Sequence, residues 1–207
     1  MTGTRRIKSS GRPARQKTAT RRRQDADRIV MGGAALLVAL ALLVIYINVR
    51  SSRPVGPEKE VPSLGNTHLA PGALSPIQYN STPPTSGPHY GGLVSWGIYR
   101  TPQRYEQLIH NLEDGGVIIY YQCGEEGCPE LVDQLEALVQ EHLDLQQRVV
   151  LLPNDPTWTD GGPIPLHQDM GSRIALTAWQ RIDKFDEFDA GRIRQFIARY
   201  QGVDHHR

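Results

Sequence analysis

The stretch IVMGGAALLVALALLVIYI, residues 29–47, is nineteen residues long and contains no charged side chain. A helix of that length rises about 28 Å, which is close to the thickness of the hydrocarbon core of a bilayer. The sequence therefore predicts one transmembrane helix over residues 29–49, which acts as a retained signal-anchor. The alternative is a cleaved signal peptide, but the following segment, NVRSSRPVG, lacks the small-x-small pattern of a cleavage site.

Residues 1–28 carry ten Lys or Arg side chains against two Asp and show no apolar periodicity. Such a segment cannot bury a core, so we expect a disordered basic arm. Positive charge concentrated before a span orients the N-terminus toward the cytoplasm. We therefore expect a single-pass protein of the plasma (inner) membrane. Its C-terminal domain lies outside the cytoplasm, and its basic arm contacts anionic lipid.

The rest of the chain has the opposite charge balance, because residues 29–207 contain 20 acidic and 13 basic side chains. Phosphate binding needs a basic surface, so we expect no nucleic-acid partner for the exported domain. The expected partners are the membrane, through the single span, and another protein of the cell envelope.

Two segments follow the expected span. Residues 50–66 carry three prolines and few apolar side chains, which is typical of a semi-extended spacer. The expected globular domain covers residues 67–203. Its patterns predict strands and helices in alternation, with strands at 93–99, 117–122, 148–153 and 173–182 and helices at 102–116, 129–144 and 189–202. The order strand, helix, strand over 117–153 predicts a parallel pair, and the fold class is α/β or α+β with helices against a small mixed sheet.

The loop STPPTSGPHYGG, residues 81–92, places three prolines and three glycines around one histidine, His89. Prolines fix φ and reduce the entropy of the unfolded chain, so the loop is expected to be preorganised, as a ligand site requires. The alternative is a structural lid, in which Ser86, His89 and Tyr90 hydrogen-bond to the backbone and seal the core.

The segment HNLED places His110 and Asp114 four residues apart on an expected helix, with Glu113 on roughly the same face. An imidazole and a carboxylate at this spacing can chelate a divalent metal. The alternative is that the two carboxylates are solvated and that His110 caps the end of the helix.

The blocks NSTPPTSGPHY, HNLEDGGVIIYY and IALTAWQR together resemble the bacterial domain-of-unknown-function family 3105, over roughly residues 66–200. Members of that family look like exported, often single-span proteins, and the resemblance implies no established activity. It implies a recurring polar set that consists of His68, His89, His110 and the position of Asp114. The family's second block is typically HNLEHG, so this chain has a harder ligand, Asp114, where the family has a histidine.

We expect the four residues of this polar set to form one metal site. Three imidazoles and one carboxylate suit Zn²⁺ or Cu²⁺. Met170 and His167 are candidates for additional ligands, whereas His142 is expected at the surface. His205 and His206 are expected in a frayed tail that binds metal only adventitiously.

Cys123 and Cys128, in QCGEEGCPE, lie between an expected strand and an expected helix. Outside the cytoplasm such a pair is expected to form a disulfide that closes a short loop. The alternative is redox activity, because Cys128 lies at a helix start, where the dipole lowers the pKa of a thiol. The spacing departs from C-x-x-C, however, and Glu125 and Glu126 act to raise that pKa.

The sequence contains no nucleophile elbow, phosphate loop or dinucleotide fingerprint, so it leaves open whether the protein is an enzyme. The leading hypothesis is a membrane-anchored extracytoplasmic domain of uncharacterised function that binds a transition metal. Two alternatives remain: a non-catalytic interaction module of the envelope, and a thiol–disulfide oxidoreductase.

Overall fold

The computed structural model describes residues 31–34, 36–46 and 56–206. The chain divides into two units, Met1–Arg53 and Pro54–Arg207. The predicted basic arm, residues 1–28, lies outside the described residues, and so do residues 50–55 of the predicted spacer.

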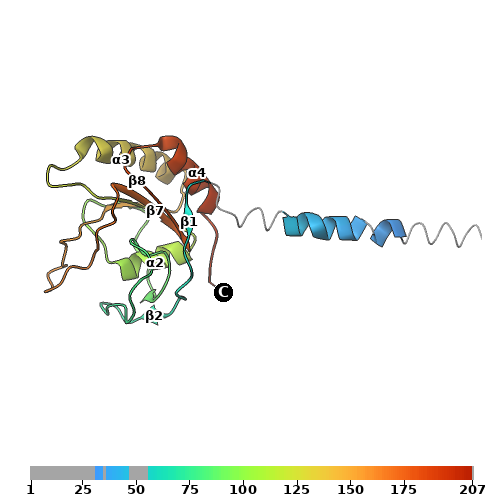
Figure 1. Ribbon diagram of the computed structural model, residues 1–207, viewed down its shortest axis with the longest axis horizontal. Coiled ribbons are helices and arrows are strands. Elements are labelled where there is room, and N and C mark those ends of the chain that lie inside the picture. Colours follow the sequence, from blue (N-terminus) through green and yellow to red (C-terminus); the bar gives the residue numbers. More distant parts are fainter. Residues whose placement is uncertain (1–30, 35, 47–55, 207) are drawn as a thin grey trace, which may run out of the picture. The chain divides into compact units, whose positions relative to one another are not determined.

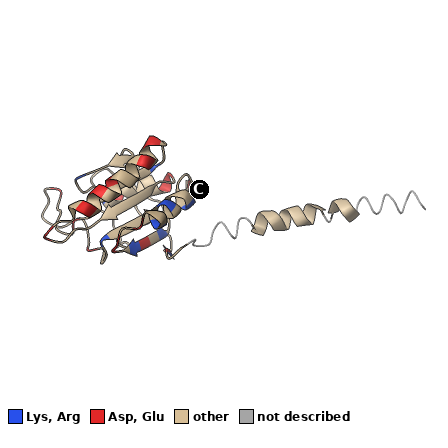
Figure 2. Cartoon of the chain, turned by 90° about the horizontal axis from the view of Figure 1, so that it is seen from above, with Lys and Arg blue, Asp and Glu red and all other residues tan. Residues whose placement is uncertain are grey.

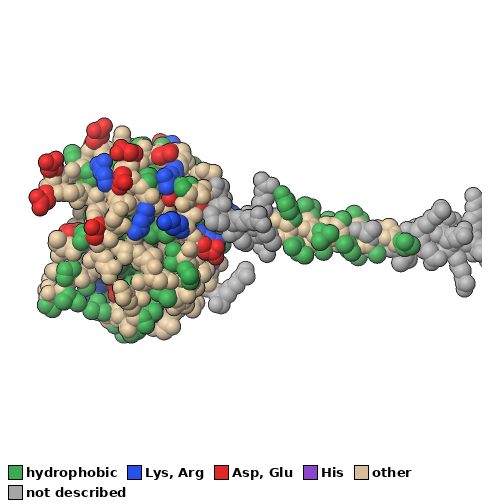
Figure 3. Space-filling view, viewed as in Figure 1, with side chains coloured by type: hydrophobic (Ala, Val, Ile, Leu, Met, Phe, Trp, Pro, Cys, Tyr) green, Lys and Arg blue, Asp and Glu red, His purple; other side chains and the backbone are tan. Residues whose placement is uncertain are grey.

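In the first unit, residues 31–34 and 36–46 are helical, and their large hydrophobic side chains are exposed (Figure 3). Among the described residues, none of the helices combines the length with the apolar character that a bilayer crossing requires. Residues 29, 30, 35 and 47–49 of the predicted span lie outside the described part of the chain.

The second unit is built on a six-stranded mixed sheet with the strand order β1-β8-β7-β5-β6-β4. Neighbours among β4, β5 and β6 pair in parallel, whereas β7 is antiparallel to β5 and β8, and β1 is antiparallel to β8. The mixed α/β fold class is therefore confirmed. The strands are β1 (Lys59–Glu60), β4 (Gly97–Ile98), β5 (Val117–Tyr121), β6 (Val149–Pro153), β7 (Ile174–Ala178) and β8 (Arg181–Phe185).

Helices cover both faces of this sheet (Figure 1). Helices α3 (Pro129–Asp144) and α4 (Ala190–Tyr200) pack on one face, and α2 (Tyr105–Glu113) packs on the other. Successive side chains of a strand point to opposite faces, so Ile119 faces α3 and α4 while Ile118 faces α2. The continuous apolar pattern of β5 and β6 follows from burial on both sides.

The crossover β5–α3–β6 gives the parallel pair that the sequence predicts, with Val117 opposite Val149 and Tyr121 opposite Pro153. Helix α3 begins at Pro129, because a proline is tolerated in the first turn, where its missing N–H has no helical partner. Figure 2 shows that α3 carries acidic positions and α4 carries arginines. Arg194 of α4 and Glu141 of α3 form an ion pair of 2.7 Å, so the two helices lie side by side.

Two predicted strands differ from the structure. The strand predicted over residues 173–182 is a hairpin, in which β7 and β8 are joined at Trp179 and Gln180. Gln180 adopts a φ of 59°, although the turn contains no Gly, Asn or Asp that would mark it in the sequence. The strand predicted over 93–99 is reduced to the two residues of β4.

The folded part begins before residue 67, within the predicted spacer. Strand β1 pairs with β8, and the neighbouring residues Glu58 and Val61 are buried. The hydroxyl of Tyr200 donates a hydrogen bond of 2.6 Å to Glu58, which ties this segment to α4. Long-range pairing, rather than local sequence pattern, therefore orders these residues.

The packing of α3 on the sheet predicts the effect of one truncation. Leu135 is completely buried there, so Leu135→Ala is expected to lower the free energy of unfolding by about 2–5 kcal/mol. Urea denaturation followed by circular dichroism measures it. The matched control is Leu145→Ala just after α3, where the side chain is 71 % exposed and the expected change is within about 0.5 kcal/mol. Equal effects of the two substitutions would contradict the described packing.

Candidate metal centre

A second, two-stranded parallel sheet places two histidines side by side. It consists of β2 (His68–Leu69) and β3 (His89–Tyr90), with His68 directly opposite His89. Directly paired residues on neighbouring strands point to the same face of a sheet. The two imidazole rings accordingly lie with their centroids 4.9 Å apart.

The proline-rich loop that carries His89 is buried over residues 83–90 and is bonded to the segment before β2. Gly87 N–H donates to the carbonyl of Gly65 at 2.9 Å, and Ser86 Oγ accepts from the N–H of Leu64 at 3.0 Å. Gly87 has a φ of 122°, and a Cβ on it would lie 3.0 Å from the ring of Tyr79, so this tight approach requires glycine. The loop therefore seals the core and positions His89 at the same time.

Helix α2 contributes His110 and Glu113, which lie on one face because they are three residues apart. Glu113 is the last residue of α2 and its side chain is completely buried. Asp114, in contrast, is the C-cap residue, with φ −72° and ψ 9°. Neighbouring residues of a helix point about 100° apart, so the two neighbouring carboxylates contact different groups.

The resulting inner cluster consists of His68, His89, His110 and Glu113, whose ligand atoms all lie within 4.8 Å of one another. From Glu113 Oε2, the distance is 2.9 Å to His89 Nε2, 3.6 Å to His68 Nε2 and 3.9 Å to His110 Nδ1. Ligands of a tetrahedral zinc ion, bonded at about 2.1 Å, lie about 3.4 Å apart. The three distances from Glu113 Oε2 bracket this spacing, so the inner cluster has dimensions that can hold such an ion.

The hydrogen bonds of the imidazoles agree with a ligand role. His89 Nδ1 lies 2.8 Å from the carbonyl oxygen of Gly87, which only accepts, so Nδ1 carries a proton and Nε2 faces Glu113. A cation, either a proton or a metal ion, is needed between that nitrogen and the carboxylate. His110 Nδ1 is buried and makes no hydrogen bond to any residue that the structure describes. The carbonyl of Gly87 orients the imidazole of His89 through Nδ1, the nitrogen that faces away from Glu113, and such a hydrogen bond is common in metal sites.

The electrostatics favour the metal-binding forms of Glu113 and His110. Burial acts to raise the pKa of Glu113, but the hydrogen bond of 2.8 Å from Asn66 Nδ2 and the nearby His89 outweigh it, so this pKa is lowered and the carboxylate is ionised. Burial lowers the pKa of His110, although Asp114 opposes the shift. Neutral imidazole and ionised carboxylate are the forms that bind metal.

The structure brings His68, His89 and His110 together but places Glu113 beside them instead of Asp114. Asp114 belongs to an outer cluster, which consists of His110, Asp114 and His206. The expectation that Asp114 completes the same set of four is corrected in this respect, because neighbouring residues of a helix point about 100° apart, and it is Glu113 that faces His68 and His89.

The remaining candidate ligands lie elsewhere or have other contacts. Met170 is 2 % exposed in the core beneath α2, and the ring of His167 stacks on Tyr105 with centroids 4.3 Å apart. His142, on α3, interacts with Gln147. None of these residues belongs to the inner or the outer cluster.

Sequence reasoning missed two residues that border the inner cluster. His206 was expected in a frayed tail, but backbone hydrogen bonds hold the tail against the end of α2, and His206 Nε2 lies 3.4 Å from Glu113 Oε2. Trp179, in the β7–β8 turn, lies with its ring centroid 6.3 Å from that of His89. Trp179 could not be identified from the sequence, because its position beside His89 depends on the β7–β8 turn, which the sequence pattern did not reveal.

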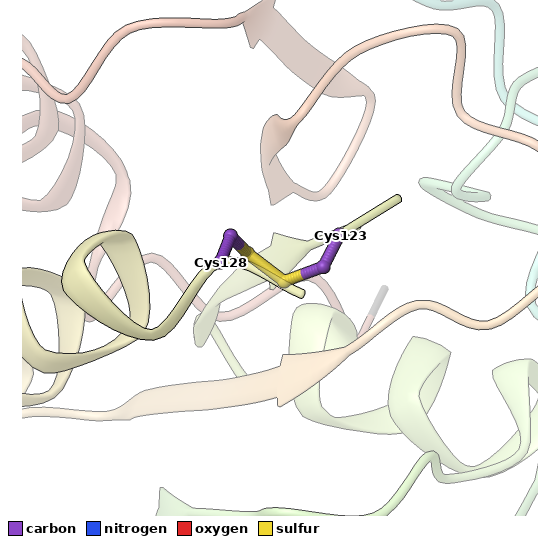
Figure 4. The surroundings of a disulfide bond; sticks show 2 residues. All are labelled: Cys123 and Cys128. Atoms are coloured by element: carbon purple, nitrogen blue, oxygen red, sulfur yellow. A yellow bond between two sulfur atoms is a disulfide. The ribbon is translucent and has the colours of Figure 1, made fainter. Parts of the chain in front are cut away.

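Cys123 and Cys128 form the predicted disulfide between β5 and α3 (Figure 4). Their Cα atoms are 5.3 Å apart, and Cys128 is 8 % exposed. Cys128 packs in the core on the side of α3 and α4, whereas the inner cluster lies beside α2. The disulfide is therefore separate from the candidate metal centre.

Comparison with known proteins gives one match. A family model described as "Protein of unknown function (DUF3105)" matches residues 72–206, which is more than half of the chain. The matched range includes His89, His110 and Glu113 and begins after His68. The comparisons with curated proteins and with solved structures gave no match.

The hydrogen bond to Glu113 predicts a pH-dependent loss of stability. The folded-state pKa of Glu113 is lowered, so its stabilising contribution is present above the ordinary pKa of 4.5 and is lost as the pH falls through the folded-state value. In protein kept metal-free with EDTA, Asn66→Ala is expected to lower the free energy of unfolding by about 1–3 kcal/mol at pH 7.

That loss is expected to shrink in acid, below the ordinary pKa of Glu113, and urea denaturation at several pH values measures it. Asn80→Ala is the matched control, because the amide of Asn80 donates at 2.8 Å to the neutral carbonyl of Pro62 in an exposed position. A loss that is equal for both variants, or independent of pH, would refute the role given to Asn66.

Proposed function

The chain belongs to the protein family of unknown function DUF3105, and we propose that its globular domain binds one divalent transition-metal ion in the inner cluster. One observation carries this proposal: the imidazole nitrogens of the three histidines of the inner cluster lie within 3.9 Å of a single buried carboxylate oxygen, Glu113 Oε2, with His206 of the outer cluster at 3.4 Å. A buried carboxylate without a cation is costly, and a metal ion supplies the charge.

The donor spacing favours Zn²⁺ over Cu²⁺. Three imidazoles and one carboxylate suit both ions, and we propose Zn²⁺ because the mean of the three distances from Glu113 Oε2, about 3.5 Å, is close to the ligand spacing of a tetrahedral zinc ion. Four protein ligands fill a tetrahedral site and leave no position for a reactive water. The proposed role is therefore metal holding, for storage or delivery, rather than metal-assisted hydrolysis.

The proposed location is the outer side of the plasma membrane, with residues 29–49 as the anchor and residues 1–28 in the cytoplasm. The uncharged run of nineteen residues and the ten basic residues before it support this placement. The exposed hydrophobic side chains of helical residues 36–46 need an apolar environment. The Cys123–Cys128 disulfide also supports an oxidising compartment.

The two alternative functions make different predictions. A thiol–disulfide oxidoreductase needs a sulfur that an external thiolate can reach, and the burial of Cys128 opposes that attack. A non-catalytic envelope module is expected to bind a protein partner in the absence of metal, with the inner cluster as internal scaffolding.

Elemental analysis of the full chain, purified without a histidine tag, tests the metal proposal. We expect one zinc ion per chain and stoichiometric Zn²⁺ binding in competition with a chromophoric chelator. His89→Ala and Glu113→Gln each remove one donor or its charge, so each is expected to weaken binding at least about 100-fold.

His142→Ala is the control for that experiment, because it removes a histidine outside both clusters, and it is expected to bind zinc as the unmodified chain does. Circular dichroism of each variant reports whether it is folded. A folded chain that binds no zinc stoichiometrically, or zinc binding that survives both substitutions at the inner cluster, would refute the proposal.

Cell fractionation and topology reporters test the location. The full chain is expected in the membrane fraction after an alkaline wash, and deletion of residues 29–49 is expected to release it, because the deletion removes the apolar run. A C-terminal alkaline phosphatase fusion, active only outside the cytoplasm, is expected to be active. An inactive phosphatase fusion together with a fluorescent cytoplasmic reporter at the same position would contradict the predicted orientation.

A further inference from the structure

The C-terminal tail returns to the metal centre after α4, and Figure 1 shows it running to the level of α2. Gly202 N–H donates to the carbonyl of Gly115 at 2.7 Å, and His205 N–H donates to the carbonyl of Glu113 at 2.9 Å. Gly115 has a φ of 75°, and a Cβ on it would lie 2.6 Å from the carbonyl oxygen of Val203. The close approach of the tail to the end of α2 therefore depends on this glycine.

These bonds place His206 between solvent and the inner cluster. Its Nε2 lies 3.4 Å from Glu113 Oε2, and its Nδ1 lies 3.5 Å from Asp114 Oδ1 and 2.8 Å from Asp204 Oδ1. The side chain of His206 is 41 % exposed and that of Asp114 is 26 % exposed, whereas that of Glu113 is fully buried. A hydrated ion can therefore reach His206 and Asp114 directly.

The outer cluster has the composition of a weaker metal site. Its two imidazoles and one carboxylate offer ligand atoms that lie within 4.8 Å of one another. Three protein donors leave further positions for water, so an ion held here exchanges ligands more easily than one in a closed site. His110 belongs to both clusters, and its ring centroid lies 5.7 Å from that of His206 and 5.3 Å from that of His89.

We propose that the outer cluster is a second metal station, through which a divalent ion such as Zn²⁺ enters and leaves the inner cluster. The inference rests on the proposed function of the inner cluster. A hydrated ion binds first to His206 and Asp114, and His110 then replaces a water. The ion then gives up His206, Asp114 and the remaining waters. Their places are taken by Glu113, His68 and His89, while His110 stays bound. The exchange changes no oxidation state, and the carboxylates of Asp114 and Asp204 attract the incoming cation.

The competing route is direct entry past His68, whose side chain is 51 % exposed. Kinetics separate the two routes. A station on the path lowers the barrier in both directions, so its removal slows loading and release by the same factor and leaves the equilibrium affinity unchanged. A residue that ligates the ion in its final position instead changes the affinity.

The experiment measures zinc loading by stopped flow and zinc release to an excess of chelator, with the full chain. His206→Ala and Asp114→Asn are each expected to slow zinc loading and zinc release by about tenfold. The dissociation constant for zinc is expected to change by less than about twofold. His142→Ala is the matched control, because it lies outside both clusters, and it is expected to leave both rates unchanged.

Three results would overturn the inference. Unchanged rates in His206→Ala and Asp114→Asn mean that the ion enters elsewhere. Faster loading and faster release together mean that the tail merely covers the inner cluster. A weaker affinity through faster release alone means that His206 is a ligand of the final site. Failure of the proposed function is distinct, because the unmodified chain then binds no zinc at equilibrium.

Discussion

The buried carboxylate of Glu113 is the group on which the arrangement of the site depends. Its side chain is fully buried at the end of α2, and an ionised carboxylate costs several kcal/mol in such a place unless it is paired. Asn66 donates to one oxygen, and the imidazoles of His68, His89 and His110 surround the other. The segment before β2, the proline-rich loop and the C-terminal tail all meet at this residue. Segments distant in the sequence thus converge on one carboxylate, and backbone hydrogen bonds between them position its partners.

The centre of the fold could be predicted from the sequence because its signals are local. The apolar runs of β5 and β6 and the amphipathic pattern of α3 give their bounds to within a residue. The hairpin of β7 and β8 could not be found, because its turn at Trp179 and Gln180 lacks the usual turn residues. Strand β1 was missed for a different reason: its order comes from pairing with β8, which is remote in the sequence.

The candidate site was predictable in part. The proline-rich loop and the helical spacing singled out His89 and His110, but His68 entered through the family resemblance alone. Glu113 and Asp114 are three and four residues from His110, so helical spacing alone could not decide which of the two carboxylates faces His68 and His89. His206 had no local signal at all, because hydrogen bonds from the tail to Gly115 and Glu113 position it.

Apolar side chains pack on both faces of the sheet, but what supplements this packing differs between the faces. On the side of α3 and α4, apolar packing is supplemented by the disulfide, and neither needs a ligand. The inner cluster instead joins α2 to the two-residue strands β2 and β3, and a strand pair this short is marginal by itself. A ligand that binds only the folded arrangement stabilises it by mass action. If the proposed function holds, a metal ion in the inner cluster would therefore mainly stabilise the contact of β2 and β3 with α2, while the sheet would remain folded without it.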